Sequence, residues 1–157
     1  MDQKYLNPFI NSLINTFEMM LGLNPEPREP QPKGEDSTNG DITGLVGFAE
    51  ANVIGSVAVS FPTEAALRLY NAMTGEEITE ITRDVEDSIG EISNIVAGGA
   101  KTVFAAEGLS FHISIPSVIV GRKHSITHKT ETPVYIVPFD MDGLEFIMEV
   151  SMKLLDA

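Results

Sequence analysis

The sequence predicts an α+β fold in which an antiparallel sheet packs against one long helix and other helices. Three observations predict it: an amphipathic helical pattern at the N-terminus, a much longer helical pattern in mid-chain, and β-rich segments on both sides of that pattern. The 157 residues suit one domain with one core. We therefore expect residues 1–157 to form a single domain.

The N-terminal segment has apolar residues at helical spacing. They form one stripe: Leu6, Phe9, Ile10, Leu13, Phe17, Met20 and Leu21. Asn7 and Pro8 suit the N-cap and first helical position, or the helix begins a turn earlier. Gly22 is the expected end of this helix.

A Pro-rich segment follows at about 24–41, with prolines at positions 25, 27, 30 and 32. Prolines at this density do not build a helix or a central strand and favour extended conformations. We expect an exposed loop or linker here. Such a run can be a ligand for an aromatic groove, but a stiff connector is the commoner role.

The first β-rich pair spans 42–46 and 53–61, with a turn at 50–52, and predicts two antiparallel strands. Thr63 is the expected cap of a helix that Gly75 ends.

The longest helical pattern runs from Thr79 or Glu80 to about Glu107. Its apolar face is Ile81, Val85, Ile89, Ile92, Val96, Ala100 and Val103. The remaining chain predicts strands at 111–115, 117–120, 134–139 and 144–152. A hairpin turn at 140–143 joins the last two.

Composition excludes several classes of function. The 23 acidic and 10 basic side chains give a net charge of −13, which disfavours nucleic acid and anionic membranes as partners. The absence of cysteine excludes disulfides, thiolate zinc sites and cysteine-dependent phosphatases. Neither a signal-peptide pattern nor a long apolar run is present, so we expect a cytoplasmic protein.

The face of the long helix opposite its apolar stripe carries regularly spaced residues: Asp84, Asp87, Glu91, Asn94, Gly98 and Lys101. Glycines at 90, 98 and 99 each cost about 0.5–1 kcal/mol relative to alanine in a helix. On the polar face, Gly98 leaves space for a ligand or partner, whereas Gly99 suits tight internal packing. The alternative is a solvated face whose glycines serve only internal packing.

Residues 89–98, Ile-Gly-Glu-Ile-Ser-Asn-Ile-Val-Ala-Gly, resemble the E-x-x-N signature helix of the CheC/FliY/CheX phosphatases of bacterial chemotaxis. The single copy points to the CheX branch, and the likeness covers roughly residues 5–152. Further matches are Asn11-Ser12, Phe17, 44–62, 65–75 and 116–122. The sequence departs from the pattern at Ser93, where many relatives have Gly, and this bears on the docking geometry.

The resemblance implies a CheC/CheX-like fold whose sheets join edge to edge in a homodimer. It also implies removal of the phosphoryl group from a phosphorylated CheY-type response regulator. Asn94 is the candidate water-orienting residue, because an amide accepts from and donates to a water at once. Glu91 would dock on the regulator's active-site lysine, and Asp87, Gly98 and Lys101 are candidate partner-binding residues.

Magnesium, phosphoaspartate and lysine would all belong to the regulator. We therefore expect no cofactor or metal site in this chain and no covalent enzyme intermediate. The competing hypothesis is a non-catalytic adaptor that binds the regulator without turnover.

Three weaker signals favour structural roles. Residues 99–102 resemble the end of a P-loop but lie inside a helix. His124 and His128 have a zinc-like spacing in a segment that reads as a polar loop. The methionines at 19, 20, 141, 148 and 152 are expected core fillers.

Overall fold

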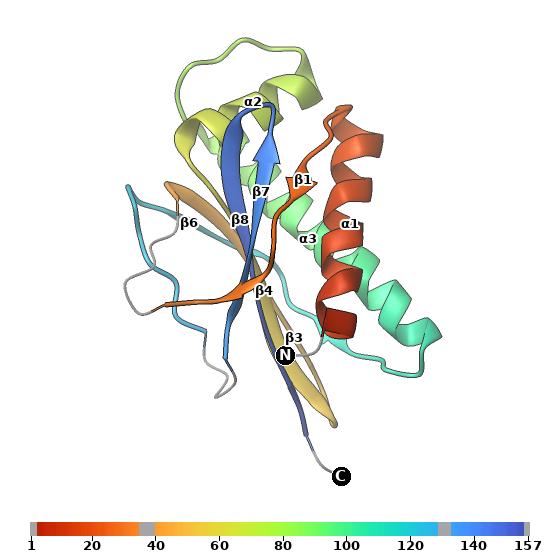
Figure 1. Cartoon of the computed structure of the whole chain (residues 1–157). Coiled ribbons are helices and arrows are strands. Elements are labelled where there is room, and N and C mark those ends of the chain that lie inside the picture. Colours follow the sequence, from red (N-terminus) through yellow and green to blue (C-terminus); the bar gives the residue numbers. More distant parts are fainter. Residues whose placement is uncertain (1–2, 35–39, 129–132, 156–157) are drawn as a thin grey trace.

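The computed structural model describes residues 3–34, 40–128 and 133–155, and these form three helices and an antiparallel sheet (Figure 1). The helices are α1 (Gln3–Leu21), α2 (Thr63–Thr74) and α3 (Arg83–Ala106). The strands are β1 (Glu26–Pro27), β2 (Gln31–Pro32), β3 (Ile42–Glu50), β4 (Val53–Phe61), β5 (His112–Ile113), β6 (Ser117–Val120), β7 (Tyr135–Met141) and β8 (Leu144–Leu154). The predicted α+β class is confirmed. None of the helices among the described residues is long and apolar enough to cross a membrane.

The sheet has the order β1-β7-β8-β4-β3-β5, with β2 also paired to β7 and β6 also paired to β3. The β3–β4 register runs from Ile42 opposite Phe61 to Glu50 opposite Val53. The turn between β7 and β8 places Asp142 and Gly143 at φ 54° and 85°. Positive φ at both central residues is typical of a type I′ hairpin turn, which fits the twist of paired strands.

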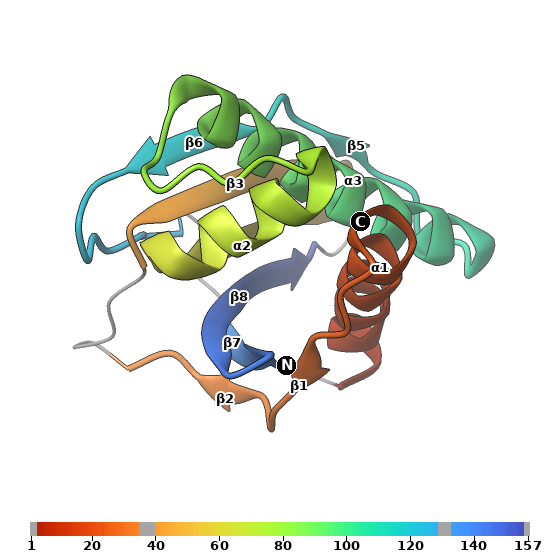
Figure 2. The ribbon, with the colours of Figure 1, turned by 90° about the horizontal axis from the view of Figure 1, so that it is seen from above.

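Strand alternation gives the sheet two unlike faces. One face carries the apolar side chains of the core, on which α1, α2 and α3 pack, and Figure 2 shows the sheet curving around these helices. On the central strands, core residues include Val57, Val59, Phe61, Met148 and Val150. Burial of each such side chain stabilises the fold by roughly 1.5–3 kcal/mol. The core therefore lies between one sheet face and the helices.

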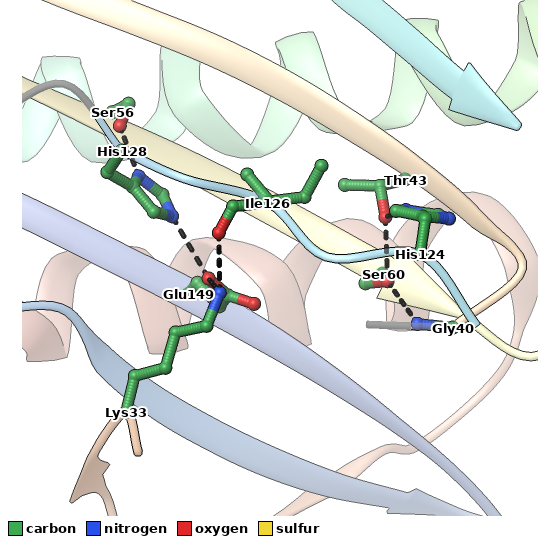
Figure 3. A network of polar contacts seen from close by, with 9 residues as sticks. All are labelled: Lys33, Gly40, Thr43, Ser56, Ser60, His124, Ile126, His128 and Glu149. Atoms are coloured by element: carbon green, nitrogen blue, oxygen red, sulfur yellow. Dashed lines mark hydrogen bonds and ion pairs between the residues drawn. The ribbon is translucent and has the colours of Figure 1, made fainter. Parts of the chain in front are cut away.

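The opposite face of the sheet is polar, with Thr43, Ser56, Ser60, Glu149 and Ser151 pointing away from the helices. Residues 121–128, the described first part of the connection after β6, cross this face and bury most of these side chains (Figure 3).

A buried charge cluster, formed by Lys33, His128 and Glu149, holds this connection against the sheet (Figure 3). The Lys33 Nζ lies 2.8 Å from Glu149 Oε1 and donates to the Ile126 carbonyl at 2.6 Å. His128 bridges Ser56 and Glu149, with 3.1 Å between His128 Nε2 and Glu149 Oε1. Every member of the cluster therefore has a polar partner inside the protein, as buried polar groups require.

The two histidines thus lie in a more buried environment than a polar loop predicts. The His128 side chain is fully buried, and His124 is half-buried between Thr43 and the Gly121 carbonyl. The two rings bond to different partners on the sheet and the connection, and this pairing depends on strands that are distant in sequence.

Helix α1 begins at Gln3, which agrees with the predicted alternative of a start one turn before Asn7-Pro8, and Gly22 ends it as expected, at φ 66°. The expectation that Thr63 caps α2 is wrong: the Asp41 carboxylate accepts hydrogen bonds from the Thr63 backbone N–H and hydroxyl. The residue that immediately precedes β3 therefore supplies the cap.

The Pro-rich segment departs from a simple loop, because residues 26–27 and 31–32 pair with the edge strand β7 over two residues each. Such short ladders suit prolines, which cannot donate a backbone hydrogen bond. Residues 35–39 of the expected loop lie outside the described residues.

Three apolar residues expected in the core lie at the surface. Met19, Met20 and Val103 are 86%, 41% and 42% exposed, so the prediction that they pack in the core is wrong. These three side chains line a groove between α1 and α3, and Phe104 enters the core instead of Val103. The methionines at 141, 148 and 152 are buried, as predicted.

Candidate active site

The outward face of α3 carries the residues singled out by their spacing. Thr82 caps the helix by accepting from the Val85 N–H, and the apolar stripe anchors α3 on the core. The opposite face reaches the surface: Asp84, Asp87 and Glu91 are exposed, and Asn94, Gly98 and Lys101 are half-buried. The prediction of one shared outward face is confirmed.

Glu91 and Asn94 lie one helical turn apart, about 4.5 Å along the axis. Within the described part of the chain, neither side chain makes a hydrogen bond or ion pair. The site therefore presents one carboxylate and one amide that are free to bind a partner, on a helix held by its buried face.

Ser93, the departure from the family pattern, points away from this site. Its side chain is 1% exposed, and its hydroxyl donates to the Ile89 carbonyl at 2.8 Å. It packs over Gly44 of β3, where an added Cβ would lie only 2.0 Å from the Ser93 Oγ. Ser93 therefore acts on the α3–β3 contact and does not touch the face that carries Asn94.

The two neighbouring glycines of α3 meet opposite environments. A Cβ added to Gly98 would have no atom within 4 Å, so the surface beside Asn94 is open at this position. A Cβ added to Gly99 would lie 2.2 Å from the Ser12 Oγ of α1. The Ser12 hydroxyl also donates to the Val96 carbonyl at 2.7 Å, so α1 and α3 approach closely here. The expectation that Gly99 serves packing is confirmed.

A groove between α1 and α3 opens directly beside Gly98. Its apolar lining includes Met19, Met20, Ile95 and Val103, and its polar lining includes Asn11 and Asn15. Sequence reasoning missed this feature, because the helical periodicity assigns Met20 and Val103 to the core. The adjacent pair Met19-Met20 was a usable signal, since one side chain of such a pair points away from the apolar stripe.

Electrostatically, the outward face of α3 divides into two halves. Its N-terminal half carries Asp84, Asp87 and Glu91, and its C-terminal half carries Lys101, whereas the adjoining groove is lined by uncharged residues. The described residues contain no group of three or more His, Asp or Glu side chains placed to hold a metal ion.

Comparison with known proteins gives the family. Residues 42–140 match the family model described as chemotaxis phosphatase CheX. The chain belongs to the CheX family. A curated relative, the CheY-P phosphatase CheX of Thermotoga maritima, is 30% identical over 125 residues, which cover 78% of this chain and 79% of the relative.

Solved structures agree with this membership. The chemotaxis protein CheX from Vibrio vulnificus superimposes with a TM-score of 0.91 at 34% identity, covering 96% of this chain and 99% of that one. CheX in a CheX–CheY–BeF3–Mg2+ complex from Borrelia burgdorferi gives a TM-score of 0.80 at 26% identity, covering 95% and 97% of the two chains. Membership in the CheX family and the CheC/CheX-like fold are therefore confirmed.

Proposed function

We propose that this CheX-family protein hydrolyses the aspartyl phosphate of a CheY-type response regulator, with Asn94 orienting the attacking water and Glu91 docking on the regulator's active-site lysine. One observation carries the proposal. Glu91 and Asn94 project one turn apart from the exposed face of α3, without a side-chain partner among the described residues and beside the open surface at Gly98.

The chemistry suits such a pair. Hydrolysis of an acyl phosphate requires a water in line with the phosphorus–oxygen bond that breaks, while cations neutralise the equatorial oxygens. The Asn94 amide oxygen would accept a hydrogen bond from the water and hold it in line. The phosphoryl group would then pass directly from the aspartate oxygen to the water oxygen. The bond from phosphorus to the aspartate oxygen breaks as the bond to the water oxygen forms, inorganic phosphate and the regulator's aspartate carboxylate are released, and no covalent enzyme intermediate forms.

Glu91, one turn before Asn94 on α3, would dock on the regulator. A carboxylate that pairs with a lysine beside the phosphoryl group fixes the helix above the reacting atoms, and charge-assisted hydrogen bonds are roughly twice as strong as neutral ones. The regulator supplies the Mg²⁺, the phosphoaspartate and the lysine. This chain supplies the water-orienting amide and the docking carboxylate.

The relatives support the proposed activity and partner. The Thermotoga maritima relative is named a CheY-P phosphatase, and the Borrelia burgdorferi relative was solved in complex with CheY, BeF3 and Mg²⁺.

The decisive experiment is phosphate release from a phosphorylated CheY-type regulator in Mg²⁺ with substoichiometric protein. The wild-type chain should turn over many equivalents, and Asn94→Ala should lose about a hundredfold in kcat or more while still binding. Asn52→Ala, which removes an exposed amide from the β3–β4 turn, is the matched control. Full activity of Asn94→Ala would exclude the mechanism, and an unchanged phosphate lifetime on a saturated regulator would favour an adaptor.

We also propose that the chain is a homodimer joined at a sheet edge. Strand β6 pairs only with β3 among the described residues, and the apolar side chains of Val120 at its end and of Ile115 just before it are exposed. Pairing two such edges would satisfy their backbone groups and cover the apolar residues. Light scattering at micromolar concentration should give twice the chain mass; a clean monomer would contradict this.

A further inference from the structure

We propose that the α1–α3 groove is the second half of the regulator-binding surface, and that it receives apolar side chains of the phosphorylated response regulator next to its phosphoaspartate. This inference rests on the proposed function. It extends the contact from the ridge at Glu91 and Asn94 to a surface built largely by α1.

Three of the eight exposed large apolar side chains among the described residues lie around this groove. Met19 is 86% exposed, and Met20 and Val103 are 41% and 42% exposed around the same hollow. A folded protein gains nothing by leaving such side chains in water, and contiguous apolar patches commonly mark interaction sites. Methionine also adapts its shape to a partner, because its side chain is unbranched and flexible.

The hydrogen-bonding groups of the groove divide into satisfied and free ones. The hydroxyls of Ser12, Thr16 and Thr102 donate to helix carbonyls. The amides of Asn11 and Asn15 are exposed and make no side-chain hydrogen bond within the described residues. Two free amides on the rim of an apolar groove suit a partner segment that offers backbone N–H and C=O groups.

Position identifies the occupant. Gly98 is a groove residue and lies about 6 Å from Asn94 along α3, and Val103 lies about 13 Å from it. A specific protein interface buries roughly 800 Å² on each partner. Glu91 and Asn94 supply a small part of that area, so a regulator seated with its phosphoryl group at Asn94 must cover adjoining surface. The groove is continuous with the site at Gly98 and is apolar.

Charge supports the same orientation. The groove is lined by uncharged residues in a chain of net charge −13, and the acidic residues of α3 lie on the other side of Asn94. A regulator would therefore place its lysine over the acidic half and an apolar segment over the groove. This arrangement gives docking a single direction along α3.

The test uses a CheY-type regulator of the same organism, activated with BeF3 and Mg²⁺, and measures its Kd by fluorescence titration. Met19→Glu on α1 and Val103→Glu on α3 each place a charge in the groove at an exposed position, so folding should survive, as circular dichroism will verify. Each should raise Kd, and KM for phosphate release, by about tenfold or more, with kcat within about twofold of wild type. Leu154→Glu, at an apolar side chain on β8 whose exposure of 48% is similar to that of Val103, is the control and should change neither.

Unchanged Kd and KM in both groove variants would overturn the proposal, even where Asn94→Ala abolishes turnover. Loss of the dimer in Met19→Glu, seen by light scattering, would also overturn it and assign the groove to a second copy of this chain. Failure of the proposed mechanism is seen separately, as retained kcat in Asn94→Ala. The Kd measurement reports on the groove alone, because it needs no hydrolysis.

Discussion

Two regions of the molecule concentrate polar side chains, and they differ in whether those side chains have partners. On the polar face of the sheet, Lys33 and His128 both contact the Glu149 carboxylate, and the three side chains are largely shielded from water (Figure 3). On the outward face of α3, Glu91 and Asn94 are accessible and unpaired within the described chain.

The difference separates stability from function. A buried polar group with a complete set of partners stabilises one arrangement of the chain. Removing it lowers the free energy of unfolding, because its former partner is left buried without a hydrogen bond or ion pair. A polar group without a partner contributes little to folding and remains available to a ligand. The buried cluster should therefore govern the free energy of unfolding, and the α3 ridge should govern activity.

The largest expected effect on stability tests the buried cluster. Lys33→Met removes the ammonium group that lies 2.8 Å from the Glu149 carboxylate, whose side chain is 0% exposed, and so deprives a buried carboxylate of this ion pair. The free energy of unfolding should fall by about 3 kcal/mol, measured by urea denaturation. The kcat of the folded protein should not change.

Arg28→Met is the matched control, because it breaks the exposed Arg28–Asp140 ion pair, which also ties the Pro-rich segment to β7. Surface ion pairs contribute about 0–1 kcal/mol. An equal loss of unfolding free energy in the two variants would mean that the burial of Glu149 does not matter, and it would contradict the proposed difference between the two regions.

Alanine substitutions at the adjacent glycines of α3, Gly98 and Gly99, should change the unfolding free energy by an intermediate amount and in opposite directions. Gly99→Ala forces its Cβ against Ser12 and disturbs the Ser12 hydrogen bond to α3, so it should cost about 1–2 kcal/mol of unfolding free energy. Gly98→Ala meets open space and should stabilise the helix by about 0.5–1 kcal/mol. Thermal unfolding of both variants checks this. Destabilisation by Gly98→Ala would show that the ridge also serves packing.

The smallest expected effect concerns the cap of α2. Hydrogen bonds from the Thr63 N–H and hydroxyl, and from the Lys123 N–H, hold the pKa of Asp41 below its usual value, against an opposing effect of burial. Since the folded pKa is the lower one, the carboxylate stabilises the fold above the unfolded pKa of about 3.9, and this contribution is lost as the pH falls through the folded pKa.

Asp41→Asn should therefore lower the unfolding free energy by about 1 kcal/mol at pH 7 and by less at pH 3. Urea denaturation at the two pH values measures the difference. A gap between variant and wild type that is independent of pH would show that the charge of Asp41 contributes nothing.

Much of the fold could be predicted from local pattern. The helical stripes, the paired strands and the outward face of α3 follow from periodicities of 3.6 and 2, which are set by the backbone over a few residues. The spacing of Glu91 and Asn94 likewise placed them on one face. Residue type at each position was sufficient for these predictions, because within one helix or strand the residues that lie close in space are also close in sequence.

Other features could not be predicted, because they join segments far apart in the chain. Asp41 caps α2 from 22 positions upstream of Thr63, and Lys33 meets Glu149 across 116 positions. The exposure of Met19, Met20 and Val103 depends on how closely α1 and α3 approach, which Ser12 and Gly99 control.

The amino-acid sequence by itself determined the α+β class, most element boundaries to within a few residues, and a polar α3 face bearing an acid and an amide. Only the tertiary structure decided which polar side chains form hydrogen bonds within the protein and which remain available to a partner. It also decided that a groove lies beside Asn94. The physical reason is that periodicity reports the direction of a side chain on its own element. Burial and pairing depend on what another element places opposite it.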